Sequence, residues 1–374
     1  MNLRRLPTRE FDFLLAMSAL ALVAYGTALI YSGSLNNYGS PAETLAHPVV
    51  RQAAFAAVGL AAMLLLARVD YRVYGPLSAT LYVLSIGALL FVLAVGSSEY
   101  GARRWIDVGG TQVQPSEFAK ITTAIMLAKF FADNEQRMDS PRVFFTSMAI
   151  VALPAALVLV EPDLGSSLTF GAMWLGMAVV AGVRLTYVGG LLLVAGGLGP
   201  LLLREFAHGY QLERIRVWLD PESDAAGAGF NILQATISIG SGGLWGKGFT
   251  DGSQTQLDYL RTQTTDYIFS VAAEELGFVG VMVLFALFLI VLFRCLRIAS
   301  LADDPFGRLI AVGVLTVILY QTFVNIGVNI RLLPVTGVPL PLVSLGGSSL
   351  IAVLASLGIL QSILGHRRRR GRRA

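Results

Sequence analysis

The sequence predicts an all-α polytopic integral membrane protein with ten transmembrane helices and one large extracytoplasmic loop between the seventh and eighth helices. The first observation is composition: 55% of the 374 residues are hydrophobic and only 14% are charged. Globular soluble domains carry about 25% charged residues. The second is that apolar runs of about 17–25 residues, enough to cross ~30 Å of hydrocarbon, recur along the chain. The third is that basic residues occupy alternate short loops.

Ten predicted spans follow from the apolar runs, with boundaries accurate to a few residues. They cover residues 11–32, 49–67, 74–96, 117–133, 143–160, 167–183, 185–203, 266–293, 307–329 and 347–365. No internal repeat, low-complexity linker or soluble second domain interrupts them. We therefore expect a single membrane domain over residues 1–374, with the large loop at 204–265 and a basic cytoplasmic tail at 366–374.

The distribution of arginine predicts the orientation. Arg4, Arg5 and Arg9 precede the first span, which places the N-terminus in the cytoplasm by the positive-inside rule. Every second loop after it is also basic, through Arg68, Arg72, Arg137, Arg142, Arg184, Arg294, Arg297 and Arg308. An even number of spans then puts both termini inside. No small-residue cleavage site follows the first basic segment, so we interpret the first apolar run as a retained helix.

Cysteine and charge exclude several classes of protein. The single Cys295 rules out an intramolecular disulfide and a zinc site built from several cysteines. The formal net charge of +4 is concentrated in the tail "HRRRRGRRA". A basic segment directly after a membrane helix is typical of contact with anionic lipid. We therefore expect no nucleic-acid partner.

A second set of basic residues falls in the predicted outer segments, against the general charge bias. These are Arg103, Arg104, Arg204, Arg214, Arg216, Lys247, Arg261 and Arg331. They are either solvated residues of translocated loops or, as a group, a surface for an anionic ligand. The loop 204–265 is too long for a plain connection, which makes it a candidate functional loop. Its pattern predicts a helix over 230–239, then a Gly-rich turn over 240–248 whose backbone amides could wrap a phosphate.

Polar motifs converge on the same predicted membrane side. They are "GARRWIDVGG" at 101–110, "QPSEFAK" at 114–120, "EPDLGSS" at 161–167 and the Pro/Gly-rich "RLLPVTGVPLPLVSLGGSS" at 331–349. Non-helical backbone is tolerated at membrane depth only where it is buried in protein or lines a wet cavity. These motifs therefore predict a polar cavity at the outer ends of the helices.

The carboxylates of these motifs have structural as well as functional interpretations. Glu117 and Lys120 share a helix face at i,i+3, so they form a structural ion pair or bind a ligand. Asp163 either caps the sixth span or faces the cavity. Glu274 and Glu275 are both expected to be structural, and one of them to make interhelical hydrogen bonds. Asp266 stands where a polar ligand can arrive, so it serves chemistry or acts as an N-cap.

The six blocks "GARRWIDVG", "QPSEFAK", "EPDLGSS", "LDPESDAAGAGFNILQATISIGSGGLWGKGF", "TDYIFSVAAEELG" and "LPVTGVPLPLVSLGGSS" together resemble the SEDS family of bacterial cell-wall glycosyltransferases. The segment "LPVTGVPLP" is similar to the elongation-type RodA branch more than to the division-type FtsW branch. The resemblance implies a ten-helix fold in the bacterial plasma membrane, with the active site on the outer face.

The resemblance also implies the substrate and the partners. The substrate would be lipid II, an undecaprenyl pyrophosphate carrying a disaccharide-pentapeptide, which is polymerised into peptidoglycan during cell elongation and shape maintenance. The expected partners are a class B penicillin-binding protein transpeptidase and the elongation machinery. The essential aspartate of the family corresponds to Asp266. Two departures stand nearby: Arg331 replaces a usual glycine, and Leu345 replaces a usual tyrosine.

These expectations define a candidate site. Asp266 would be the general base that takes a proton from the acceptor hydroxyl in an inverting displacement. The expected substrate-binding residues are Arg103, Trp105, Glu117, Lys120, Asp163, Arg214, Arg216, Lys247 and Ser348. Either basic side chains or a divalent ion, Mg²⁺ or Mn²⁺, would balance the pyrophosphate charge, and no organic cofactor is expected. The alternative functions are a lipid II flippase and a scaffold that only docks the transpeptidase.

Overall fold

The computed structural model describes residues 11–38, 47–99, 102–108, 111–206, 209–224 and 227–367. Each predicted span coincides with a helix. They are α1 (Phe13–Tyr38), α2 (Pro48–Arg68), α3 (Tyr74–Val95), α4 (Pro115–Asp133), α5 (Pro141–Val160), α6 (Leu164–Ala181), α7 (Leu185–Phe206), α11 (Ile268–Leu301), α12 (Pro305–Asn329) and α13 (Gly347–Gly365). Arg4, Arg5, Arg9 and the tail beyond residue 367 lie outside the described residues.

Eight of these helices, within the described residues, are long and apolar enough to cross a membrane, so the chain is a multi-pass membrane protein. The two others are α4 and α7. Helix α4 carries Glu117, Lys120, Lys129 and Asp133 along its 19 residues. The apolar stretch recognised in α7 is Leu185–Val194. The count of ten spans therefore stays a prediction.

The helix boundaries follow from residues with clear conformational preferences. Helices α2, α4, α5 and α12 begin with Pro48, Pro115, Pro141 and Pro305, at positions where the missing N–H is not needed. Asp163 and Asp304 cap α6 and α12 by accepting backbone hydrogen bonds from Ser166 and Gly307. Helix α6 ends at Gly182 in the left-handed conformation.

Helices α12 and α13 occupy the centre of the bundle, while α2 and α3 line its edge. About two thirds of the apolar window of α12 (67%) and 78% of that of α13 are buried, against 22% in α2 and α3. Helix α13 packs closely on α2 because two glycines let the backbones approach. A Cβ atom on Gly358 would lie 2.6 Å from the Met63 carbonyl oxygen, and one on Gly59 would lie 2.6 Å from Leu354 Cδ1.

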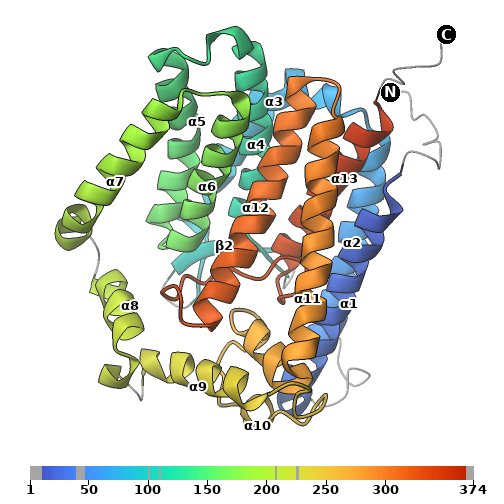
Figure 1. Ribbon diagram of the computed structural model, residues 1–374, viewed down its shortest axis with the longest axis vertical. Coiled ribbons are helices and arrows are strands. Elements are labelled where there is room, and N and C mark those ends of the chain that lie inside the picture. The colour runs from blue at the N-terminus through green and yellow to red at the C-terminus, as the bar shows by residue number, and fades with distance from the viewer. Residues whose placement is uncertain are drawn as a thin grey trace.

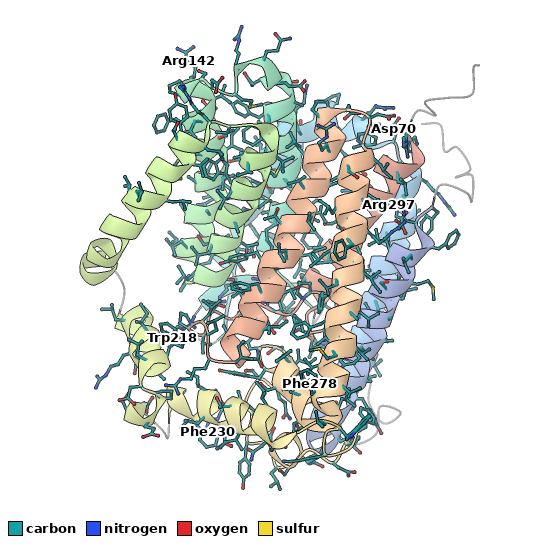
Figure 2. All side chains as sticks on the ribbon, viewed as in Figure 1. Asp70, Arg142, Trp218, Phe230, Phe278 and Arg297 are labelled. Carbon is teal, nitrogen blue, oxygen red and sulfur yellow. The ribbon has the colours of Figure 1, made fainter. Side chains whose placement is uncertain are left out.

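The segments predicted to face outward gather at one end of the bundle. Figure 1 shows α8, α9 and α10 toward its lower end and β2 just below the lower ends of α5 and α6, with the start of α1 and the end of α13 at the opposite end. Figure 2 places Trp218 and Phe230 at the lower end, and Asp70, Arg142 and Arg297 toward the other. The segments predicted to face outward therefore lie at the end of the bundle opposite the start of α1 and the end of α13. Which of the two ends faces the cytoplasm stays a prediction.

The large loop contains more helix than the sequence indicated. The predicted helix at 230–239 is present as α9 (Ala228–Ser241). Two further helices, α8 (Gly209–Leu219) and α10 (Ser253–Gln256), and the 3₁₀ turn η3 (Pro221–Asp224) were not predicted. Helix α7 leans away from the bundle and leads to α8 (Figure 1).

The fold is helical, as predicted, apart from one small antiparallel sheet. It has the order β1–β2–β3, formed by Ser97–Glu99, Ala102–Val108 and Thr111–Val113. Its register pairs Ser98 with Arg103 and Asp107 with Gln112. The β-branched and aromatic residues of "RWIDV" favour a strand, but a run this short is not distinguishable from a loop by pattern alone.

Helix α11 is interrupted at Gly277, which has φ 63° and ψ −165°, a conformation open to glycine. The Gly-rich turn docks on this break. The Lys247 and Gly248 amides donate to the Glu274 and Glu275 carbonyl oxygens at 2.9 and 3.1 Å. The sequence indicates that amides of this turn could wrap a phosphate; in the structure two of them hold the turn against the broken helix.

The carboxylates before the break are anchors. Glu274 is fully buried and accepts hydrogen bonds from Lys247 Nζ at 2.9 Å, Gln254 N at 2.9 Å and both donors of Thr255 at 2.9 and 3.1 Å. Glu275 accepts a hydrogen bond from the Ser32 hydroxyl of α1, which is the expected interhelical bond.

Candidate active site

Asp266 stands two residues before α11, at the end of the bundle that carries the large loop. Its side chain is partly buried. The backbone around it is held from the C-terminal half of the chain. The carbonyl oxygens of Thr264 and Thr265 accept hydrogen bonds from the Leu345 amide at 2.9 Å and the Ser344 hydroxyl at 2.6 Å. The Asp266 segment is thus fixed by tertiary contacts, not by its own helix.

The charges around Asp266 come from three other segments. Burial raises the pKa of the Asp266 carboxyl to about 6, and nearby Asp163 adds to the increase, while the guanidinium groups of Arg214 and Arg104 act in the opposite direction. A carboxyl with this pKa is largely ionised at neutral pH and still basic enough to accept a proton. That is the property expected of a general base.

Arg104 and Asp163 form the side of the site contributed by β2 and α6. Arg104 Nη1 lies 3.4 Å from Asp163 Oδ2, and the guanidinium carbon of Arg104 lies 5.4 Å from the centre of the Trp105 ring. Both distances restrict the guanidinium to one orientation. Asp163 is buried, and its Oδ1 accepts the Ser166 amide at 3.0 Å. Asp163 therefore caps α6 and faces the site at once.

Glu161 adds a second unusual carboxyl. It is 1% exposed, and neither carboxyl oxygen has a hydrogen-bond partner among the described residues. Burial, and after it the nearby Asp163, raise its pKa to about 8, and Arg104 acts in the opposite direction. At neutral pH Glu161 is therefore mainly a neutral acid beside Arg104, so it does not cancel that cation.

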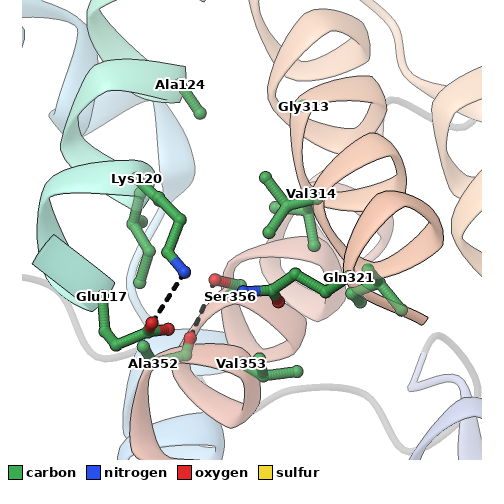
Figure 3. Close-up of a pocket in the computed structure, with 12 residues that line it drawn as sticks. Glu117, Lys120, Ala124, Gly313, Val314, Gln321, Ala352, Val353 and Ser356 are labelled. Atoms are coloured by element: carbon green, nitrogen blue, oxygen red, sulfur yellow. Dashed lines mark hydrogen bonds and ion pairs between the residues drawn. The ribbon is translucent and has the colours of Figure 1, made fainter. Parts of the chain in front are cut away.

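Glu117 and Lys120 lie in a neighbouring pocket between α4, α12 and α13. Lys120 Nζ is 2.7 Å from Glu117 Oε1, and both side chains are 3% exposed. Figure 3 shows the pair facing Gln321 and Ser356 across the pocket. The Lys120 cation is thus balanced by its own buried partner.

Gln114 connects this pocket to the Asp266 site. Its side-chain amide donates to Asp163 Oδ2 at 3.4 Å, and its backbone amide donates to Ser348 Oγ at 2.9 Å. Ser348 belongs to α13, which begins directly after the last outer segment. The motifs at 114–120, 161–167 and 331–349 therefore meet, as the sequence predicted.

The remaining predicted binding residues are placed differently. Arg214 on α8 donates to the Val335 carbonyl oxygen at 3.3 Å and directs its charge toward Asp266. Arg216 is exposed on the same helix. Lys247 pairs with Glu274 at 2.9 Å, within the docked turn. The side chain of Arg103 lies outside the described residues.

The two departures from the family pattern have structural explanations. Arg331 adopts φ 61°, a conformation in which glycine is favoured, and its guanidinium donates to the Leu219 and Trp218 carbonyl oxygens at 3.1 and 3.4 Å. It thereby ties the end of α8 to the end of α12. Leu345 holds Thr264 through its backbone amide, a bond that does not depend on its side chain.

Arg104, Glu161, Asn325 and Asn329 belong to this site but were not among the predicted site residues. Successive residues of a strand face opposite sides, so only one of Arg103 and Arg104 can point at a given neighbour, and sequence does not say which. Asn325 and Asn329 could have been recognised from the sequence. Two amides one turn apart on an apolar helix are expected to face the interior of a bundle.

This arrangement supplies a base beside two guanidinium groups, a combination suited to group transfer from an anionic leaving group. The donor set does not fit a metal held by the protein alone. The described residues contain no group of three His, Cys, Asp or Glu side chains that could hold a metal ion.

Comparisons with known proteins agree with this geometry. The family model described as "Cell cycle protein", which covers FtsW, RodA and SpoVE, matches residues 12–369. The peptidoglycan glycosyltransferase MrdB of Escherichia coli K12 is 39% identical over 361 residues, covering 96% of this chain and 95% of that protein. The probable peptidoglycan glycosyltransferase FtsW of Geobacter metallireducens is 36% identical over 369 residues, covering 97% and 96%.

Solved structures show the same fold. The rod shape determining protein RodA of Thermus thermophilus superposes with a TM-score of 0.70 at 28% identity, covering 96% of this chain and 98% of that one. A chain from a peptidoglycan synthase complex, described for its coordination of polymerisation and crosslinking, gives a TM-score of 0.81 at 30% identity, covering 96% and 99%. The chain therefore belongs to the FtsW/RodA/SpoVE (SEDS) family of membrane proteins.

Proposed function

We propose that this protein is a peptidoglycan glycosyltransferase that polymerises lipid II during cell-wall elongation. The observation that carries the proposal is Asp266 itself, a carboxyl at one end of a membrane bundle, with a pKa of about 6 and the charges of Arg214 and Arg104 acting on it. The names of the relatives support the same reaction class, because MrdB is named a peptidoglycan glycosyltransferase and FtsW a probable one.

The chemical step is a single displacement at the donor sugar. Asp266 accepts the proton of the acceptor 4-hydroxyl as that oxygen forms a bond to C1 of the donor. The bond from C1 to the phosphate oxygen breaks, and the diphosphate leaves with the electron pair. Attack on the face opposite the leaving group inverts the anomeric centre, so an α-linked donor gives a β-1,4 bond.

The leaving diphosphate needs positive charge at the moment of cleavage. Arg104 on β2 and Arg214 on α8 are the best placed residues, because the positive charge of each already lowers the pKa of the Asp266 carboxyl. Lys120 is a weaker candidate, since it lies in the neighbouring pocket and is not among the charges that act on Asp266. A Mg²⁺ or Mn²⁺ ion that arrives bound to the diphosphate would add to this charge. Chelation followed by restoration of each metal measures that contribution.

The orientation and the partner are part of the proposal. We place the end that carries Asp266 on the outer face of the plasma membrane and both termini in the cytoplasm, because the two terminal segments and the alternate short loops together carry most of the arginines. We propose a class B penicillin-binding protein transpeptidase as the partner. The related chain from a complex that couples polymerisation to crosslinking supports this assignment.

Purified full-length protein in detergent, supplied with labelled lipid II, separates the enzyme from a flippase, because no membrane remains to be crossed. We expect glycan polymer to form. No polymer in detergent, together with lipid II translocation in sealed vesicles, would contradict the proposal in favour of transport. Normal growth of cells that carry outer-cavity substitutions, with the transpeptidase complex intact, would indicate a scaffold.

A further inference from the structure

Two asparagines on α12 converge on the backbone of Asp266. Asn329 Nδ2 lies 2.8 Å from the Asp266 carbonyl oxygen, and Asn325 Nδ2 lies 3.1 Å from the same oxygen. Both side chains are buried, at 1% and 2% exposure. Buried amides are retained only where their hydrogen bonds are made, so this double contact is a specific feature of the end of α12.

The other polar atoms of these amides reach the neighbouring segments. Asn329 Oδ1 accepts from the Ser270 amide at 3.2 Å and from the Ser270 hydroxyl at 2.7 Å. Asn325 Nδ2 also donates to the Val338 carbonyl oxygen at 2.9 Å. The pair therefore joins three segments at one point: the segment just before α11, the first turn of α11, and the outer segment after α12.

The carbonyl of Asp266 is the third of three consecutive backbone carbonyls that accept hydrogen bonds from the C-terminal third of the chain. Thr264, Thr265 and Asp266 each present a carbonyl oxygen to a donor from the C-terminal third of the chain, and only that of Asp266 receives two side-chain donors. Fixing the carbonyl limits rotation of the peptide that carries the carboxyl. The position of the carboxyl relative to the charges of Arg104 and Arg214 that act on it then depends on α12.

We propose that Asn325 and Asn329 are positioning residues that hold Asp266 in its reactive orientation, an inference that rests on the proposed function of Asp266 as base. Neither asparagine touches the reacting atoms. Their contribution is geometric: a displacement of about 1 Å at a reacting group can lower turnover roughly 100-fold. They should therefore affect kcat more than KM.

The test compares Asn329→Asp, Asn329→Ala and Asn325→Ala with Thr322→Val in the purified full-length protein. Aspartate keeps the shape of asparagine but, when ionised, cannot donate to the Asp266 carbonyl. Thr322 is a matched control, because it is buried on the same helix and its hydroxyl has no partner among the described residues. We expect kcat for lipid II polymerisation to fall roughly 10- to 100-fold in the Asn329 variants and less in Asn325→Ala, with KM within about 2-fold of wild type. The control should match wild type.

A second readout does not require polymerisation. The titration of the Asp266 carboxyl, followed as the infrared difference between each protein and its Asp266→Asn counterpart, reports the surroundings of that side chain. We expect the midpoint to move by roughly half a pH unit or more when Asn329 is replaced, because the distances from the carboxyl to Arg104, Arg214 and Asp163 change.

An unchanged midpoint and a kcat within 2-fold of wild type in folded Asn329 variants would overturn the positioning role and leave the proposed reaction intact. Conversely, a wild-type protein that makes no polymer, with a midpoint that still moves in the variants, would reject the proposed reaction and keep the positioning role. If Asn329→Asp fails to fold, Asn325→Ala carries the same comparison through the second donor.

Discussion

Replacing Arg214 with glutamine removes the cation that most favours the ionised form of Asp266. Glutamine keeps a hydrogen-bond donor for the Val335 carbonyl oxygen but carries no charge. In the present structure burial raises the pKa of Asp266 to about 6, and Arg214 is the larger of the two guanidinium influences that oppose the increase. Losing it must raise that pKa further, because the carboxylate loses a stabilising partner.

The size of the effect follows from the known range for such pairs. An opposite charge within about 4–6 Å lowers the pKa of a carboxyl by roughly 1–3 units. Arg104 remains in the variant, so we take the lower end of the range. The acid limb of the pH–rate profile should then move from about pH 6 to about pH 7, and activity at pH 6.5 should fall several-fold.

The assay is kcat/KM for lipid II polymerisation between pH 5 and 9, because this ratio reports the free enzyme. Arg216→Gln is the matched control. It removes the same charge from the same helix, but Arg216 is exposed and is not among the charges that shift the pKa of Asp266. Its acid limb should stay near pH 6. If the acid limb of the pH–rate profile stays in place in Arg214→Gln, or moves equally in both variants, the assignment of Asp266 as the titrating base is refuted.

Three other predictions concern stability and are followed by thermal unfolding. Arg331→Ala should be less stable than Arg331→Gly by about 1–2 kcal/mol, because both lose the contact with α8 while only glycine relieves the positive φ; equal stability would argue against that strain. Glu161→Gln should leave stability unchanged at low pH and increase it, by about 3–5 kcal/mol at most, above pH 8. The folded pKa of Glu161 is raised from 4.5 to about 8, so wild-type stability declines across that window, and parallel pH curves would contradict this. Glu274→Ala should cost about 3–5 kcal/mol and expose residues 243–256 to protease, because Lys247 and the loop amides lose a buried acceptor; unchanged cleavage would contradict the anchor role.

Much of the helical architecture could be predicted from sequence, because span length and loop charge are local properties. Pro48, Pro115 and Pro141 fixed helix starts that patterns alone place within a few residues. The ends of α1 and α11 were underestimated. Helix α11 continues to Leu301. The apolar run used to predict its end stops at Phe293, because the charged Arg294 and Arg297 follow, although both are still helical.

The site could be predicted as a collection of motifs but not as a geometry. Asp266, Asp163 and Arg214 were identified because each is an expensive or unusual residue at a membrane boundary. The sequence does not say whether Arg103 or Arg104 contacts Asp163, because this depends on which face of β2 is turned toward that carboxylate. The importance of Asn325 and Asn329 depends on a carbonyl about 60 residues away in sequence, a contact that only tertiary packing creates.

The most direct measurement compares wild-type protein with Asp266→Asn, in detergent, for both lipid II binding and polymer formation. Asparagine has the shape of the carboxylate but cannot accept the hydroxyl proton. We predict that the variant folds, binds lipid II with an affinity close to wild type and forms no glycan polymer. Polymer of normal length and rate from Asp266→Asn would show that another group removes the proton.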